Sequence, residues 1–262
     1  MNRQKDFYAD RFYVVTGSTQ GVGEAIAMAL ANAGAAGVVI CGRNDANGTR
    51  VVAALEASGA AAAYVPADLE DPADCRRIVA TCGERFGRID GLVNAAGLTD
   101  RGTIEDTSVE LWDRMFAVNT RAPFLLMQDA IRMMKRDRRG GAIVNIITMS
   151  SHGGQPKLTA YCASKGALAT LTKNVAHAVR FDRIRVNGIN IGWTATPNEH
   201  RVQLAEGQPE DWLAHAEATQ PMGRLITTQD VANLTLFLLG PPSGVMTGSL
   251  IDCDQMVIGA YD

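Results

Sequence analysis

The chain has 262 residues and a formal net charge of -3, and 47% of its residues are hydrophobic and 20% charged. These values are ordinary for a soluble globular protein, and the length favours one extended α/β domain over two small ones. The basic block at residues 135–139 is better explained as the solvent-facing end of a helix than as a nucleic-acid site. No run approaches a membrane span, and residues 1–10 lack the apolar stretch of a signal peptide. We therefore expect neither a nucleic-acid partner nor a membrane association.

The cysteines and histidines do not form a metal-binding pattern. The four histidines show no H-x-x-x-H or H-E-x-x-H spacing, so we expect no catalytic metal. Cys162 has no neighbouring histidine that would activate it, and we interpret it as a small packed residue. An odd number of scattered cysteines favours a reduced, cytoplasmic protein. The five are Cys41, Cys75, Cys82, Cys162 and Cys253.

The first predicted elements form a site for a dinucleotide. A short apolar strand at residues 12–15 leads into a turn with Gly17, Gly21 and Gly23, and an Ala-rich helical pattern follows at residues 24–33. The unpaired N–H groups and the positive dipole end of such a helix attract a pyrophosphate, and glycines leave room for its approach. The spacing is G-x-x-x-G-x-G and not the G-x-G-x-x-G of long-chain dehydrogenases.

A second strand is expected at residues 37–41, and it ends at Gly42 and Arg43. In dinucleotide folds the end of this strand meets the adenosine ribose, where an acidic residue binds the 2′-hydroxyl and an arginine accommodates a 2′-phosphate. Arg43 therefore favours NADP. The alternative is that Arg43 is an exposed loop residue, and NAD is not excluded.

Strands and helices continue to alternate through the remaining chain. This order predicts a single Rossmann-type domain, in which a doubly wound parallel sheet carries helices on both faces and binds ligands at the carboxyl ends of its strands. We expect Thr228 to cap the last helix. The further strands are expected at residues 61–65, 91–93, 142–147, 185–190 and 246–252, and the helices at residues 45–58, 72–86, 108–138, 159–172 and 228–239.

Tyr161 and Lys165 stand four residues apart in the helical segment 159–172. Both side chains therefore leave the same face of the helix, one turn apart. An ammonium beside a phenol lowers the phenol pKa from about 10 toward the range in which it exchanges a proton with an alcohol or a carbonyl. The pair alone is weak evidence for a catalytic site, because a surface helix can also carry a tyrosine and a lysine at this spacing. The accompanying motifs are what favour a catalytic interpretation.

These motifs together resemble the short-chain dehydrogenase/reductase family. The resemblance rests on the glycine turn, Asn94-Ala95-Ala96-Gly97, Asn119 and the Tyr161-x-x-x-Lys165 pattern, and it extends over residues 11–254. It implies an NAD(P)-dependent oxidoreductase that interconverts a secondary alcohol and a ketone by hydride transfer. By resemblance Tyr161 exchanges the proton, Lys165 lowers its pKa, and Asn119 distorts its helix and holds a water in a proton relay.

The catalytic serine of the family usually stands thirteen residues before the tyrosine, and this position is Thr148. A threonine keeps the hydroxyl that donates to a substrate carbonyl. Ser150 and Ser151 follow closely and could take the role if the loop has another register. We favour Thr148 over Ser150.

The resemblance also implies a set of cofactor contacts. Asp68 is expected on the adenine amino group, although it could instead cap the helix that begins at Pro72. Gln20 stands where many NADP-preferring members carry a basic residue, and Ile191 replaces the proline that usually precedes Gly192. The expected cofactor-binding residues are Gly17, Thr19, Gln20, Gly21, Val22, Gly23, Arg43, Asp68, Leu69, Asn94, Ala95, Ala96, Gly97, Tyr161, Lys165, Gly192, Thr194 and Thr196.

Residues 197–220 are polar and lie where the family has its mobile substrate lid. His200, Gln203 and Trp212 in this segment favour a polar, sugar-like or polyol-like substrate, unless they simply face solvent. A 3-oxoacyl thioester, a hydrophobic ketone and a non-catalytic dinucleotide-binding sensor are the alternatives. We also expect a homo-oligomer, a tetramer or a dimer.

Overall fold

The structure, a computed structural model, describes residues 7–258. Over these residues seven strands, all paired in parallel, form one sheet in the order β3-β2-β1-β4-β5-β6-β7. The order reverses between β1 and β4, which is the place where α/β sheets of this kind bind their ligands. The predicted doubly wound sheet is confirmed. The strands are β1 (Phe12–Val15), β2 (Gly37–Gly42), β3 (Ala61–Pro66), β4 (Gly91–Asn94), β5 (Gly141–Ile146), β6 (Ile184–Ile191) and β7 (Leu250–Cys253).

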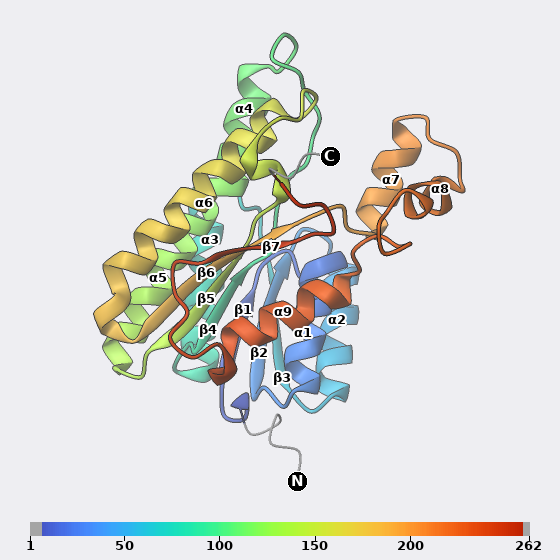
Figure 1. Ribbon diagram of the computed structural model, residues 1–262. Coiled ribbons are helices and arrows are strands. Elements are labelled where there is room, and N and C mark those ends of the chain that lie inside the picture. Colours follow the sequence, from blue (N-terminus) through green and yellow to red (C-terminus); the bar gives the residue numbers. More distant parts are fainter. Residues whose placement is uncertain (1–6, 259–262) are drawn as a thin grey trace.

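Helices cover both faces of the sheet (Figure 1). One face carries α1, α2 and α9, and the other carries α3, α5 and α6. Successive residues of β1 serve opposite faces, because Val14 packs on the α3–α5 side while Tyr13 and Val15 pack on the α1–α9 side. A strand covered on both faces is buried at every position, which explains the continuous apolar runs in the sequence. The bounds are α1 (Gly21–Asn32), α2 (Asp45–Ala57), α3 (Pro72–Phe86), α5 (Ala122–Asp137), α6 (Thr159–Val179) and α9 (Thr228–Leu239).

The helix expected over residues 108–138 is interrupted in its middle. It consists of α4 (Val109–Phe116), a π-helical turn (Ala117–Arg121) and α5. Pro123 has no N–H to donate to the carbonyl four residues before it, which is the carbonyl of Asn119. The wider turn therefore lies where Asn119 was expected to distort the helix.

Two capping predictions are wrong. The N-cap of α9 is Thr227 and not Thr228, because Thr227 and Asp230 form a reciprocal capping box. The N-cap of α3 is Asp71, whose side chain accepts from the Ala73 backbone. Asp68 instead accepts a hydrogen bond from the Glu70 backbone at 3.0 Å.

Some boundaries also differ from those expected. Helix α6 continues to Val179, and α5 ends at Asp137 because Arg138 adopts a left-handed backbone with φ 52°. Strand β7 begins at Leu250, after Gly248 turns the chain with φ 71°.

The segment between β6 and α9 protrudes from the body of the molecule (Figure 1). It holds two short helices, α7 (Pro197–Ala205) and α8 (Trp212–Ala218). No helix among residues 7–258 has the length and apolarity needed to cross a bilayer. The same residues contain no group of three or more side chains arranged to hold a metal ion.

Candidate active site

The predicted site residues line one edge of the sheet. Strand order places the segments after β3, β2, β1, β4, β5 and β6 next to one another at the carboxyl ends of the strands. The segments after β3, β2 and β1 carry Asp68, Arg43 and Gly17. Those after β5 and β6 carry Thr148 and Gly192. The edge is thus divided into an adenosine side and a catalytic side.

The turn after β1 is closely packed against the segment that follows β4. Gly17 has φ 62°, and a Cβ placed on it would lie 2.7 Å from the Ala96 Cα. The Thr16 hydroxyl oxygen accepts hydrogen bonds from the backbone N–H groups of Ala95 and Ala96 at 3.1 and 3.2 Å. A side chain on Gly23 would run into the Gly17 carbonyl. These contacts explain why the turn needs glycine at both positions.

The N-terminus of α1 fits a dinucleotide pyrophosphate. Its N-cap, Gln20, makes no side-chain capping bond, so the first N–H groups of the helix remain available. Gly21, with φ 58°, begins the helix, and Val22 and Gly23 follow. Free backbone N–H groups at the positive end of a helix bind phosphate groups.

On the adenosine side, Arg43 is exposed directly after β2. A Cβ at Gly42 would lie 2.6 Å from the Thr19 hydroxyl oxygen, so Thr19 excludes a side chain from position 42. Asp68 and the half-buried Leu69 follow β3, next to the end of β2.

Arg50, which the sequence did not identify as a site residue, contacts the glycine turn and the helix that follows it. It forms an ion pair with Glu24 at 2.7 Å and donates to the Thr19 carbonyl at 3.3 Å. The pair links α2 to the helix on which the phosphate site begins.

The catalytic side brings Thr148, Tyr161, Lys165 and Asn119 together. The Thr148 hydroxyl lies near enough to the Tyr161 phenol to act on its pKa. Lys165 Nζ donates to the Ile146 carbonyl at the end of β5 at 2.9 Å. A Cβ built on Gly97 would lie 3.2 Å from Lys165 Nζ and 3.4 Å from Asn119 Oδ1. Residues from β5, α6, the π-turn and the segment after β4 therefore converge at one place.

Burial shifts the pKa of both titrating groups. Loss of solvent raises the pKa of Tyr161 to about 12, although the hydrogen bond with Thr148 and the charge of Arg101 act in the opposite direction. Burial lowers the pKa of Lys165 to about 8. The net pKa of Tyr161 thus moves opposite to the predicted lowering, because desolvation of a phenol outweighs the favourable charges around it.

Asn119 is fully buried and fixes the segment after β4. Its Oδ1 accepts from the Leu98 N–H at 2.9 Å, and its Nδ2 donates to the Leu98 carbonyl at 3.0 Å and to Ser164 Oγ at 3.0 Å. These bonds connect the π-turn with the catalytic helix α6.

Thr148 and Ser150 are neighbours, and the Thr148 hydroxyl donates to Ser150 Oγ at 3.2 Å. Thr148 begins the turn Met149–His152 and accepts from the Ser150 N–H at 3.2 Å, while its hydroxyl also reaches Tyr161. The Ser150 hydroxyl donates to Gln155 Oε1 at 2.5 Å. Of the two hydroxyls, that of Thr148 is the one that acts on the Tyr161 phenol.

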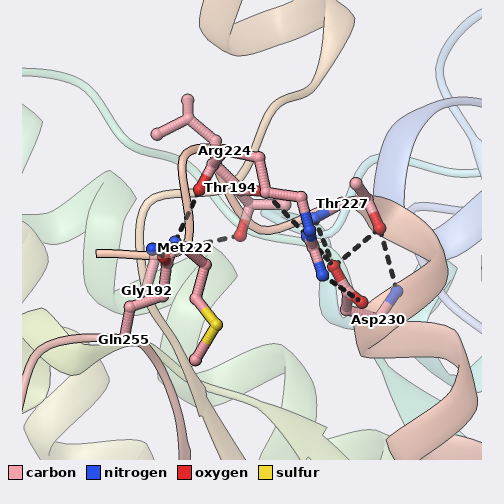
Figure 2. Close-up of polar contacts among 8 residues, drawn as sticks. Gly192, Thr194, Met222, Arg224, Thr227, Asp230 and Gln255 are labelled. Carbon is pink, nitrogen blue, oxygen red and sulfur yellow. Dashed lines mark hydrogen bonds and ion pairs between the residues drawn. The ribbon is translucent and has the colours of Figure 1, made fainter. Parts of the chain in front are cut away.

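The segment after β6 forms the base of α7. The Thr194 hydroxyl donates to the Gly192 carbonyl at 2.9 Å (Figure 2), and Thr196 caps α7 by accepting from the Glu199 N–H at 3.0 Å. A Cβ on Gly21 would lie 3.9 Å from the Thr196 side chain, so this base faces the glycine turn.

The segment that follows α8, at residues 222–224, is hydrogen-bonded to Gln255 near the C-terminus (Figure 2). Gln255 Nε2 donates to the Arg224 carbonyl at 2.7 Å, and Gln255 Oε1 accepts from the Met222 N–H at 2.8 Å. The Arg224 guanidinium also pairs with Asp230 at 2.6 Å. The segment with α7 and α8 is therefore held at both of its ends.

Three residues interpreted as substrate-facing hold that segment together. Trp212 is only 4% exposed and its indole N–H donates to His200 Nδ1 at 2.8 Å. Gln203 Nε2 donates to Glu199 Oε1 at 2.7 Å, and the Trp193 indole donates to the same oxygen at 2.8 Å. These internal contacts account for His200, Gln203 and Trp212 without a substrate.

Asn94 was expected by resemblance to tie the central strands together, but its partners Asn145 and Thr172 were missed. Asn94 Nδ2 donates to Asn145 Oδ1 at 2.8 Å, and Asn145 Nδ2 donates to the Thr172 hydroxyl at 2.9 Å. This polar chain ties β4 to β5 and α6, all three residues being buried. The signal was present, because an asparagine inside the otherwise apolar run 142–147 requires a buried partner.

The chain is similar in sequence to known oxidoreductases. Residues 17–255 match a family model described as Enoyl-(Acyl carrier protein) reductase. A D-beta-hydroxybutyrate dehydrogenase of Rhizobium meliloti is 36% identical, over 92% of this chain and 96% of that protein. A 2-(S)-hydroxypropyl-CoM dehydrogenase 3 of Xanthobacter autotrophicus is 32% identical, over 92% and 93%.

A solved structure shows the same fold. The short-chain type dehydrogenase/reductase from Mycobacterium marinum superposes with a TM-score of 0.87 at 29% identity, and the match covers 97% of this chain and 98% of that one. Taken with the family match and the two named relatives, it shows that the chain belongs to the short-chain dehydrogenase/reductase family and is an oxidoreductase acting on CH-OH groups.

Proposed function

We propose that the protein catalyses the reversible, NADP-preferring oxidation of a polar secondary alcohol to a ketone. The observation that carries the proposal is the meeting of Thr148, Tyr161 and Lys165 beside the segment after β4, opposite the glycine turn. A phenol, a hydroxyl and an amine at such a place serve proton exchange with an alcohol oxygen.

Tyr161, Thr148, Lys165 and Asn119 each have a distinct role in the proposed reaction. Bound nicotinamide supplies the hydride acceptor or donor. The Tyr161 hydroxyl holds the proton that passes to the ketone oxygen during reduction, and Thr148 donates a hydrogen bond to that oxygen. Lys165 contributes positive charge and holds the nicotinamide ribose, while Asn119 serves a proton relay. The raised pKa keeps Tyr161 protonated at neutral pH, which suits it to reduction.

The cofactor preference rests on the end of β2. An exposed arginine, Arg43, follows Gly42, and Thr19 leaves no room for the acidic side chain that would bind a ribose 2′-hydroxyl at position 42. This supports NADP. NAD is the alternative, because Gln20 supplies no second positive charge.

The names of the relatives support a secondary alcohol on a polar molecule, since one is named for D-beta-hydroxybutyrate and the other for 2-(S)-hydroxypropyl-CoM. We propose a polar substrate of this kind, admitted under a lid at residues 197–220. A sugar or polyol belongs to the same class. A 3-oxoacyl thioester or a hydrophobic ketone is the competing substrate class.

We further propose a homo-oligomer in a reduced cytoplasmic compartment. Val109, Trp112 and Phe124 are exposed on α4 and α5, and a second copy would cover them. All five cysteines are free.

The test is a panel of polar and apolar ketones and polyols, assayed with NADPH, NADH and their oxidised forms. We expect turnover of a polar ketone with NADPH. Cofactor binding without turnover of any compound would favour a non-catalytic sensor instead.

A further inference from the structure

Arg101 lies near the candidate active site, since its charge acts on the Tyr161 phenol. Its neighbour Gly102 pairs with Leu158, accepting from the Thr159 N–H at 3.0 Å and donating to the Lys157 carbonyl at 2.9 Å. The catalytic helix α6 begins at Thr159, so the backbone beside Arg101 is fixed to the turn that carries Tyr161.

The Arg101 side chain extends to the lid segment. Its Nε donates to Glu206 Oε1 at 2.8 Å, and Glu206 is the residue that ends α7. The pair joins the segment after β4 to the lid across a separation of 105 residues in the chain. The Arg101 side chain keeps 32% of its surface exposed and that of Glu206 keeps 38%, so both border solvent.

The guanidinium retains most of its donor capacity. Glu206 uses Nε, and Nη1 makes one long contact of 3.5 Å with the Thr99 carbonyl. The adjacent carboxylate of Asp100 does not compete, because it pairs with Arg114 at 2.6 Å. Within residues 7–258, Arg101 Nη2 makes no hydrogen bond. The planar Nη1–Nη2 edge can therefore donate two parallel hydrogen bonds to a carboxylate.

The charge of Arg101 also reaches the reacting phenol, since it lowers the pKa of Tyr161. The carboxylate that acts oppositely on this pKa, Glu199, accepts hydrogen bonds from the Trp193 indole and from Gln203. Glu199 is therefore occupied within the lid, and Arg101 is the cation available to a substrate.

We propose that Arg101 binds a carboxylate of the substrate through its free Nη1–Nη2 edge, and that Glu206 on Nε is an internal anion that weakens this binding. The inference rests on the proposed function and narrows its polar substrate to a hydroxy acid or oxo acid. Arg101 is then a specificity-determining residue.

The test compares ketones that differ in charge alone. The pairs are acetoacetate with acetoacetamide and levulinate with levulinamide, each reduced with NADPH. For at least one pair we expect the wild type to prefer the carboxylate by about tenfold or more, and Arg101→Gln to lower kcat/KM for it by about 30-fold, since charged hydrogen bonds are lost. The amide should change by less than about threefold.

Glu206→Gln supplies the decisive contrast. Removal of the competing anion should lower KM for the carboxylate by about three- to tenfold. An ion pair that merely latches the lid predicts losses in both variants, equal for carboxylate and amide, and that result would overturn the inference. Arg76→Gln, which breaks a surface ion pair with Asp129 between α3 and α5, is the matched control and should leave the carboxylate preference unchanged.

Binding separates this inference from the proposed function. Calorimetric titration of levulinate and levulinamide into the NADPH-loaded protein measures anion recognition without chemistry. If neither ketone is reduced but levulinate binds about tenfold more tightly in the wild type than in Arg101→Gln, the proposed reaction fails while the anion site stands. Equal binding of acid and amide, or no binding of either, contradicts the anion site even where neutral ketones are reduced.

Discussion

Replacing Thr148 by valine removes one hydroxyl and keeps the branched shape of the side chain. Thr148 is 6% exposed, accepts from the Ser150 N–H at 3.2 Å and acts to lower the pKa of Tyr161. Loss of a donor to a developing oxyanion typically lowers kcat by about 10²–10³-fold, or roughly 3–4 kcal/mol. We expect a decrease of that size in ketone reduction with NADPH.

The same substitution has a structural cost that must be measured separately. It leaves the buried Ser150 N–H without its acceptor, which costs about 1–3 kcal/mol of unfolding free energy. A Tm lower by about 2–10 °C is the corresponding expectation for a chain of this size. Steady-state kinetics below the transition, with cofactor affinity measured by titration, distinguish the catalytic from the structural effect.

Two control variants test the assignment. Thr148→Ser keeps the hydroxyl and should retain activity within about tenfold. Ser150→Ala removes the hydroxyl that donates to Gln155 and accepts from the Thr148 hydroxyl, but it keeps the Thr148 hydroxyl itself. If Ser150→Ala abolished turnover while Thr148→Val did not, Ser150 would be the catalytic hydroxyl and our register would be wrong.

Other predictions concern the cofactor and the proton. Arg43→Glu should raise KM for NADPH by about tenfold or more and change KM for NADH by less than about threefold, and equal changes would remove Arg43 from the ribose site. Gly17→Ala places a methyl group 2.7 Å from the Ala96 Cα at φ 62°. It should lower the unfolding free energy by about 2–4 kcal/mol in thermal melts and abolish cofactor binding in titrations. Because burial raises the pKa of Tyr161 to about 12, the phenolate fraction increases with pH through the neutral range. The kcat/KM for alcohol oxidation should therefore increase with pH while that for ketone reduction does not, and parallel profiles would argue against Tyr161 as the proton-exchanging group.

The sheet was predictable because most of its strands are covered on both faces and so appear in the sequence as apolar runs. The glycine turn was predictable for a similar reason, since the contact between Gly17 and Ala96 tolerates no side chain. The break near Asn119 could be expected as well. Pro123 lies four residues later and cannot close the hydrogen bond to its carbonyl.

The features that the sequence did not reveal depend on contacts between distant segments. Arg101 and Glu206 meet only because the lid folds toward the segment after β4. The raised pKa of Tyr161 follows from its desolvation in the assembled site, which the spacing to Lys165 cannot express. Trp212 appeared to be an exposed lid residue, yet it forms a small core with Ala216 and Leu225.

The most direct measurement of the central claim is the turnover of Tyr161→Phe, compared with its affinity for NADPH. Tyr161 lies in contact with Thr148 and on the same helix as Lys165. The substitution removes one oxygen and should leave the glycine turn and the cofactor affinity nearly unchanged. We predict that ketone reduction falls to background while NADPH binds within about threefold of the wild-type affinity. Retained reduction of the same ketone by Tyr161→Phe would contradict the assignment of the phenol as the group that exchanges the proton.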